Sequence, residues 1–200
     1  MDYKYITGSK LLPYSFSKTR WLDDKLVADR AIEIWPNIKK ILQVWQSGPK
    51  SKCPDSRCYR IVRDAAADDL VLVKMHFFSY VASLMQPFLT LYQSTQPIVA
   101  FMHEDISCLM IKLLCIIMKD EMVSNLSLHQ LSKLDLNNRT SLKPVIELGC
   151  AATNFLANLR RKDLVDEQKV FNFNKDCRIF VVTAVENLSG GSEWLLGVIS

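Results

Sequence analysis

The chain has 200 residues, but only six are glycine, seven are proline and three are histidine. So little Gly and Pro excludes a collagen-like or low-complexity chain. The two adjacent glycines at 190–191 are the closest that the sequence comes to a Gly-rich loop, and neither G-x-x-x-x-G-K-[ST] nor G-x-G-x-x-G occurs. A loop that cradles phosphate groups is therefore not expected. With 49% hydrophobic and 23% charged residues, the composition predicts a globular domain with a buried core.

The sequence also lacks a long hydrophobic run. Its best stretch, residues 106–118, has 13 residues and contains Lys112. A transmembrane helix needs about 20 apolar residues, so this stretch predicts a buried helix and we expect no membrane partner. The opening residues 1–8 carry Asp2 and Lys4 and lack the apolar core of a secretory signal. The six cysteines are therefore expected to be reduced.

Motifs for catalysis or metal binding are missing as well. The sequence has no G-x-S-x-G elbow and no reactive-cysteine signature. His103, Glu104 and Asp105 are adjacent, and adjacent residues on a helix point in different directions. Cys53 and Cys58 have no second ligand pair nearby, as a structural zinc site requires. We predict no catalytic residue, no metal, no cofactor and no small-molecule substrate.

Charge is distributed unevenly along the chain. Residues 1–63 contain 13 Lys and Arg against 6 Asp and Glu, and residues 64–200 contain 12 against 15. The formal net charge of the whole chain is +4. A basic first third could follow a nucleic-acid backbone. The alternative is an ordinary solvated surface.

Apolar residues at steps of three and four predict an all-α fold, a single domain of about seven helices. We expect an extended segment over residues 1–22, the helical domain over 23–188 and a divergent apolar tail over 189–200. Asp23 or Asp24 and Asp68 or Asp69 are expected to cap helices. The predicted helices cover about 23–47, 57–66, 68–92, 97–119, 127–134, 144–161 and 166–188.

Several finer features of these helices also follow from the pattern. Pro36 is expected to kink or restart the first helix, because proline lacks the amide donor. In the short helix at 57–66, Tyr59, Ile61 and Val62 are expected to face inward. Pro144 is expected to occupy the first turn of its helix, where a missing N–H costs nothing.

Arg20 and Trp21 are the candidate nucleic-acid-binding residues. A guanidinium next to a large aromatic side chain can contact phosphate while the ring stacks on bases. The alternative is that Trp21 packs the first helix onto the core while Arg20 lies on the surface.

The order of these segments resembles the hAT-superfamily transposases and the animal proteins derived from them. The similarity begins with S-K-T-R-W at 17–21 and V-A-D-R-A-I-E-I-W-P-N-I at 27–38. It covers about residues 5–190, nearly the whole chain. The later matching stretches are FFSYVA at 77–82, QPFL at 86–89, YQ at 92–93, Pro97, FM at 101–102, LKP at 142–144, LRRKD at 159–163 and the helix around 173–185.

The resemblance implies that this chain is similar to the helical insertion domain of an RNase H-like transposase. In that family the catalytic domain carries an acidic triad, with a BED-type zinc finger before it and a dimerisation segment at its end. None of these parts has a counterpart here, and residues 189–194 depart from the family pattern. Two-metal chemistry needs such carboxylates, so the resemblance implies a catalytically inactive protein. The family also associates the Trp of its Arg-Trp pair with transposon-end DNA.

The sequence thus predicts a non-enzymatic, transposase-derived helical protein with residual nucleic-acid or protein binding. DNA is the expected partner, and the resemblance implies a nuclear location, with the cytoplasm as the alternative. A protein-interaction module without a nucleic-acid role is the alternative function. In that case an exposed apolar surface would bind another protein or a second copy of the chain.

Overall fold

The computed structural model describes residues 3–14, 21–48, 54–93 and 102–189. These residues form eight α-helices, one short 3-10 helix and no β-strand, which confirms the predicted all-α fold. None of the described helices is long and apolar enough to cross a membrane. The helices are α1 (Tyr3–Thr7), α2 (Trp21–Ser47), α3 (Arg57–Ala66), α4 (Val71–Tyr92), α5 (Met102–Ile117), η3 (Asp120–Met122), α6 (Leu128–Ser132), α7 (Cys150–Arg161) and α8 (Glu167–Ser189).

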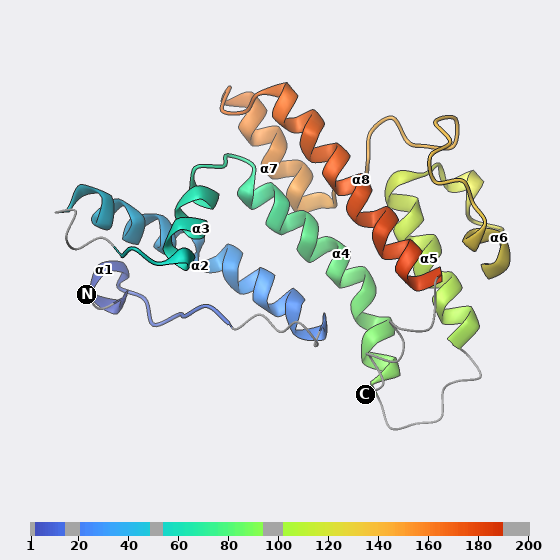
Figure 1. The fold of residues 1–200 in the computed structure, drawn as a ribbon, viewed down its shortest axis with the longest axis horizontal. Coiled ribbons are helices and arrows are strands. Elements are labelled where there is room, and N and C mark those ends of the chain that lie inside the picture. The colour runs from blue at the N-terminus through green and yellow to red at the C-terminus, as the bar shows by residue number, and fades with distance from the viewer. Residues whose placement is uncertain (1–2, 15–20, 49–53, 94–101, 190–200) are drawn as a thin grey trace.

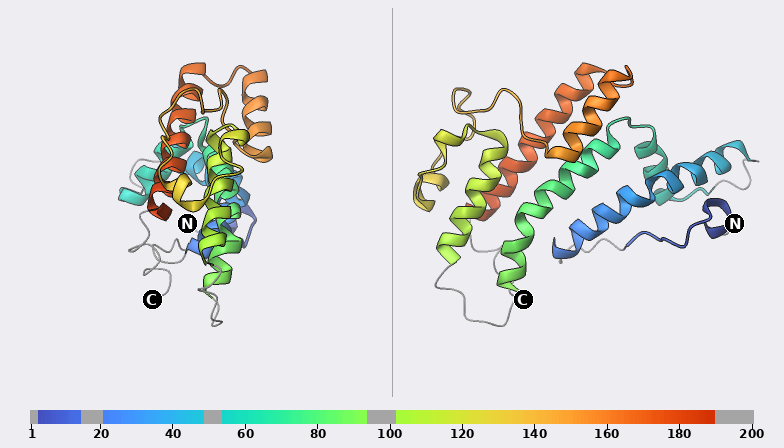
Figure 2. Two further views of the ribbon diagram at one scale, coloured as in Figure 1. Left: turned by 90° about the vertical axis from the view of Figure 1, so that its right-hand side faces the viewer. Right: turned by 180° about the vertical axis from the view of Figure 1, so that it is seen from behind.

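Helix α4 runs through the middle of the molecule (Figure 1) and contacts α2, α5 and α7. Helices α1, α2 and α3 lie toward one end, and α5 and α6 lie toward the other. The reverse view in Figure 2 shows the same order, with α7 and α8 together on the side of α4 away from α2. The long helices are therefore arranged around α4 rather than around a closed bundle axis.

Two separate sets of apolar side chains hold these helices together. The main core contains residues from α4, α5, α7 and α8, and Phe77 lies at its centre with the rings of Phe173 and Phe180 each 6.3 Å away. The buried residues of α2 and α3 lie outside this main core. That second set comprises Ala28, Ile34, Trp35, Ile41, Leu42 and Tyr59.

A polar contact adds to the packing of α2 against α4. The Asp29 carboxylate accepts a hydrogen bond from the Ser79 hydroxyl at 2.5 Å and one from the Lys25 ammonium at 2.5 Å. Burial raises the pKa of Asp29, but these two donors lower it by more, so the pKa lies below its usual value. The carboxylate therefore stays charged and keeps both partners at neutral pH.

Pro36 does not start a new helix, because the structure shows a single helix from Trp21 to Ser47 with Pro36 inside it. The missing N–H of Pro36 costs this helix one backbone hydrogen bond. The expected cap at Asp23 or Asp24 is also wrong, because α2 begins at Trp21 and both residues lie in its first turn.

The N-terminal segment is only partly extended. The strand-like alternation at residues 3–6 is misleading, because Tyr3–Thr7 form the short helix α1, which contacts α2. Residues 8–14 follow without helix or strand, and the Arg30 guanidinium lies 4.6 Å from the centre of the Tyr14 ring. A lone strand would leave its amides unpaired, since the described residues offer no neighbouring strand, whereas a helical turn pairs them locally.

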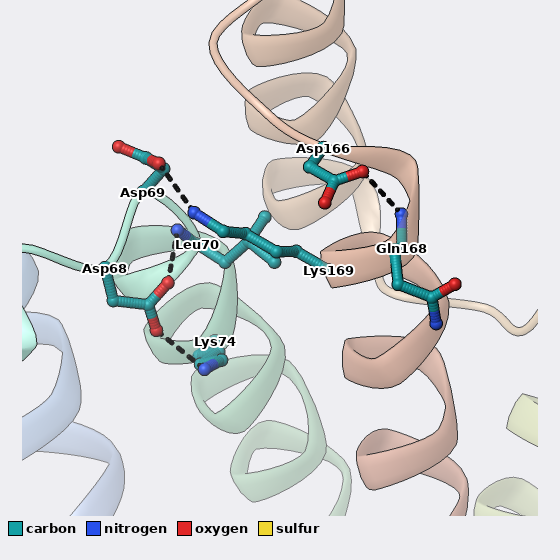
Figure 3. A network of polar contacts seen from close by, with 7 residues as sticks. All are labelled: Asp68, Asp69, Leu70, Lys74, Asp166, Gln168 and Lys169. Carbon is teal, nitrogen blue, oxygen red and sulfur yellow. Dashed lines mark hydrogen bonds and ion pairs between the residues drawn. The ribbon is translucent and has the colours of Figure 1, made fainter.

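The loop before α4 is held by two aspartates (Figure 3). Asp68 accepts a hydrogen bond from the Leu70 amide at 2.9 Å and one from the Lys74 ammonium at 2.6 Å. Asp69 meets Lys169 of α8 at 3.4 Å. Burial raises the pKa of Asp68, but Lys74 and the Leu70 amide outweigh it and keep the pKa below its usual value. The predicted helix cap at Asp68 or Asp69 is wrong, because Leu70 is the residue that precedes α4 and no side chain caps the helix there.

The start of α7 differs from the prediction. Residues 144–149 are not helical, and α7 begins at Cys150. The Lys143 amide donates to the Ile117 carbonyl and the Glu147 amide to the Ile116 carbonyl, each at 2.9 Å. This segment therefore pairs with the otherwise unpaired end of α5, and its backbone is not available for a helical turn.

Gly149 makes the bend between this segment and α7. Its φ of +79° lies in the region that side chains disfavour, and a Cβ there would come within 2.6 Å of the Tyr80 ring. Residues 141–149, which we call the capping segment, can therefore pass close to α4 only because residue 149 is glycine.

We predict that Gly149→Ala lowers the free energy of unfolding by about 3 kcal/mol, from backbone strain and the clash with Tyr80. Urea denaturation followed by circular dichroism measures it. Gly8→Ala is the matched control, because Gly8 has a similar φ of +69° but no atom within 4 Å of its added Cβ. Equal losses from both substitutions would contradict the close approach at Tyr80.

We predict that Asp68→Asn destabilises the protein at neutral pH and that the deficit disappears in acid. A carboxyl whose pKa is lowered on folding stabilises the protein above its unfolded pKa, about 3.9, and loses that contribution as pH falls through the folded value. Urea midpoints of both proteins at several pH values test this. Asp69→Asn should have little effect at any pH, since the contact of Asp69 with Lys169 is exposed. A deficit for Asp68→Asn that persists at low pH would count against the prediction.

Candidate nucleic-acid interface

The structure says little about the predicted pair Arg20 and Trp21. Arg20 falls outside the described residues, and Trp21 is the first residue of α2, with a side chain that the structure does not describe. The nucleic-acid-binding roles of both residues therefore stay predictions.

A row of arginines on α3 is the clearest basic surface among the described residues. Arg57, Arg60 and Arg63 are exposed and follow one another at steps of three along the helix. Such spacing places them on neighbouring positions of one face. Tyr59 is the buried residue of α3, and its ring meets the ring of Trp45 on α2 at 5.6 Å. The contact with α2 thus turns the arginines outward.

Lys39 of α2 extends this row. Lys39 and Arg63 line the same groove of about 500 Å³ between α2 and α3, together with the amide side chains of Gln43 and Gln46. We call Lys39, Arg57, Arg60 and Arg63 the α3 basic surface. Side-chain amides and cations are the groups that proteins use to bind phosphate oxygens.

The four cations differ in their ion pairs. Arg63 forms an ion pair with Asp64 at 2.8 Å. Lys39, Arg57 and Arg60 form no ion pair with any described residue. Their charge is therefore available to an anionic partner, which is the requirement for binding that releases counterions from nucleic acid.

The α3 basic surface lies far from the start of α2. Lys39 follows Trp21 by eighteen positions, a distance of roughly 27 Å along a helix axis. The arginine row was not predicted from the sequence, although its three-residue spacing is a readable signal. Ile61, expected to face inward, is 57% exposed instead, because α3 packs on α2 through a narrow stripe around Tyr59.

A second polar cluster lies at the end of α5. The Lys143 ammonium donates to the Cys115 carbonyl at 2.5 Å and meets the Asp120 carboxylate at 2.9 Å. Glu147 accepts a hydrogen bond from the Tyr80 hydroxyl at 2.7 Å and lies 3.9 Å from Lys143. These contacts tie the capping segment to α4 and α5.

The chemistry of this cluster does not favour a nucleophile. Burial, and then the charge of Asp120, raises the pKa of the Cys115 thiol, so the thiol stays protonated at neutral pH. The hydrogen bond from Lys143 lowers the pKa of Asp120, which stays a carboxylate. The cluster is therefore suited to holding the helix end. Elsewhere among the described residues, no three His, Cys, Asp or Glu side chains lie close enough together to hold a metal ion.

Comparison of the chain with protein-family profiles, curated proteins and solved structures finds no match. The resemblance to hAT transposases therefore stays a prediction from the sequence.

We predict that Lys143→Met lowers the free energy of unfolding by about 1–3 kcal/mol, because the buried Cys115 carbonyl loses its charged donor. Thermal and urea denaturation measure this loss. Lys112→Met is the control, because it removes an exposed cation from α5, the helix that carries Cys115. It should change the free energy of unfolding by less than about 0.5 kcal/mol. Similar effects from both variants would show that Lys143 has no special role at the helix end.

Proposed function

We propose that this protein is a non-enzymatic, transposase-derived helical domain that binds nucleic acid through the α3 basic surface. The observation that carries the proposal is the set of exposed cations that form no ion pair with a described residue, Lys39, Arg57 and Arg60. Phosphate contacts by Lys and Arg are the main source of sequence-independent affinity for DNA.

The geometry of α3 supports the proposal further. The arginines of this ten-residue helix span less than two turns, about 9 Å of helix axis from Arg57 to Arg63. Each DNA strand carries one phosphate per about 3.4 Å of its helix axis, so a row of this length can contact more than one phosphate. No base-reading group is evident in the row, and we propose binding with little sequence preference.

The resemblance to hAT transposases supports the same class of function, and the proposal includes the nuclear location that the resemblance implies. Under this proposal Arg20 and Trp21 form a second nucleic-acid contact. The alternative function, a protein-interaction module, draws support from a different surface, a groove between α7 and α8.

We predict that the double variant Arg57→Gln/Arg60→Gln binds double-stranded DNA about tenfold more weakly than the wild type. The slope of log affinity against log salt should also decrease by about two, one for each lost phosphate contact. Fluorescence anisotropy with a labelled duplex of about 30 base pairs, at about 50–200 mM salt, measures both quantities.

Lys133→Gln/Lys162→Gln is the matched control, because it removes the same charge from exposed positions just beyond the ends of α6 and α7. Equal weakening by both double variants would show an effect of net charge alone and contradict the assignment to α3. Single Arg20→Ala and Trp21→Ala variants test the predicted second contact. Mg²⁺- or Mn²⁺-dependent cleavage of the duplex by the purified protein would overturn the non-enzymatic proposal.

A further inference from the structure

A groove of about 700 Å³ runs between α7, α8 and the capping segment. Its wall on one side is the capping segment, which the hydrogen bonds to the end of α5 hold in place. Leu148 and Leu156 are buried residues that line it. The groove is therefore a feature of packed elements with fixed neighbours.

The rim of the groove is apolar and open to solvent. Val145 on the capping segment is 76% exposed and Phe171 on α8 is 65% exposed, and both line the groove. Exposed large side chains beside a groove are typical of protein interaction sites. Sites for small molecules instead enclose 70–90% of their ligand, which an open groove of this kind cannot do. The shape therefore favours an extended or helical segment of another protein.

Arg178 provides a positive charge inside this groove. One guanidinium nitrogen, Nη2, donates to the Lys143 carbonyl at 3.2 Å, and the other, Nη1, is buried without a hydrogen-bond partner. Arg178 forms no ion pair with the described residues, and burial lowers its pKa because desolvation disfavours the cation. Arg178 is only partly buried, so a carboxylate in the groove can approach it, and a counter-charge there would offset the cost of removing the cation from water.

The other charged residues of the groove leave the balance positive. Lys175 is exposed, three positions before Arg178 on the same helix. Arg160 is occupied by a two-point ion pair with Glu167, with distances of 2.7 and 2.8 Å. Among the residues lining the groove, the acidic one is Glu147, which is already bonded to Tyr80. The uncompensated charge is therefore that of Arg178 and Lys175.

We propose that this groove is a docking site for a protein segment in which a carboxylate lies next to an apolar side chain. The carboxylate would pair with Arg178, with Lys175 close enough to add to the attraction. The apolar side chain would cover Phe171 and Val145. This site is separate from the α3 basic surface and does not depend on nucleic-acid binding.

A library of short random peptides displayed on phage, panned on the full chain, tests the proposal. We expect the selected peptides to be enriched in Asp or Glu beside Leu, Ile, Phe or Trp. A synthetic copy of a selected peptide should bind at least about tenfold more tightly than its Asn/Gln counterpart, since a desolvated charge pair depends on both partners.

The enrichment and the tenfold difference should both disappear with Arg178→Gln. Lys162→Gln is the matched control, since it removes one exposed charge just beyond α7 and outside the groove. Phe171→Ser provides a second test, because a side chain that is 65% exposed contributes little to folding. Phe171→Ser should weaken peptide binding without changing the urea midpoint. It therefore tests whether the peptide binds in this groove even if Arg178→Gln does not fold.

Four results would overturn the proposal. Three concern the peptide: the absence of any acidic enrichment, equal binding of the carboxylate and amide peptides, and unchanged binding by the Phe171→Ser variant. The fourth is a loss of DNA affinity in Arg178→Gln as large as that in Arg57→Gln/Arg60→Gln, because the groove would then belong to the nucleic-acid surface. Peptide binding by a protein that fails to bind DNA would leave this site intact while removing the proposed function.

Discussion

The carboxyl end of α5 sets the main structural constraint. Leu113, Ile116 and Ile117 are fully buried, so the carbonyls of this last turn are screened from water and need partners within the protein. Backbone amides of the capping segment and the Lys143 ammonium provide them. This requirement fixes the path of residues 141–149, and with it the start of α7 and one wall of the groove that contains Arg178. The need to pair the carbonyls at the end of α5 thus shapes the groove that the capping segment lines.

The two proposed binding surfaces arise from different packing units. The α3 basic surface depends on the contact of Tyr59 with Trp45, which lies outside the main core. The groove depends on the main core itself, through Leu148 and Leu156. A substitution in one of these binding surfaces can therefore leave the structure of the other unchanged. A small helical domain could in this way contact nucleic acid and a protein partner at the same time.

Sequence patterns were most informative where polar residues mark both ends of a helix. The predicted limits 57–66 and 166–188 differ from α3 and α8 by no more than one residue, because apolar spacing and polar flanks mark these helices. The predictions failed where a segment distant in the sequence binds the backbone amides that a predicted helix would need. Pro144 is a good first residue for a helix, yet the Glu147 amide that follows it donates its hydrogen bond to the Ile116 carbonyl at the end of α5. Ile61 has the right spacing for burial, but no element covers that side of α3 among the described residues.

By itself, the sequence determined the all-α class, the positions of most helices, the excess of positive charge in the first third and the three-residue spacing of the arginines. These are local properties, since helical periodicity and charge are set by residues close together in the chain. Only the tertiary structure decided which arginines lack partners, that Gly149 must bend against Tyr80, and that Arg178 lies in an apolar groove. Each of these depends on contacts between residues tens of positions apart, and such contacts follow from how the helices pack rather than from any one segment.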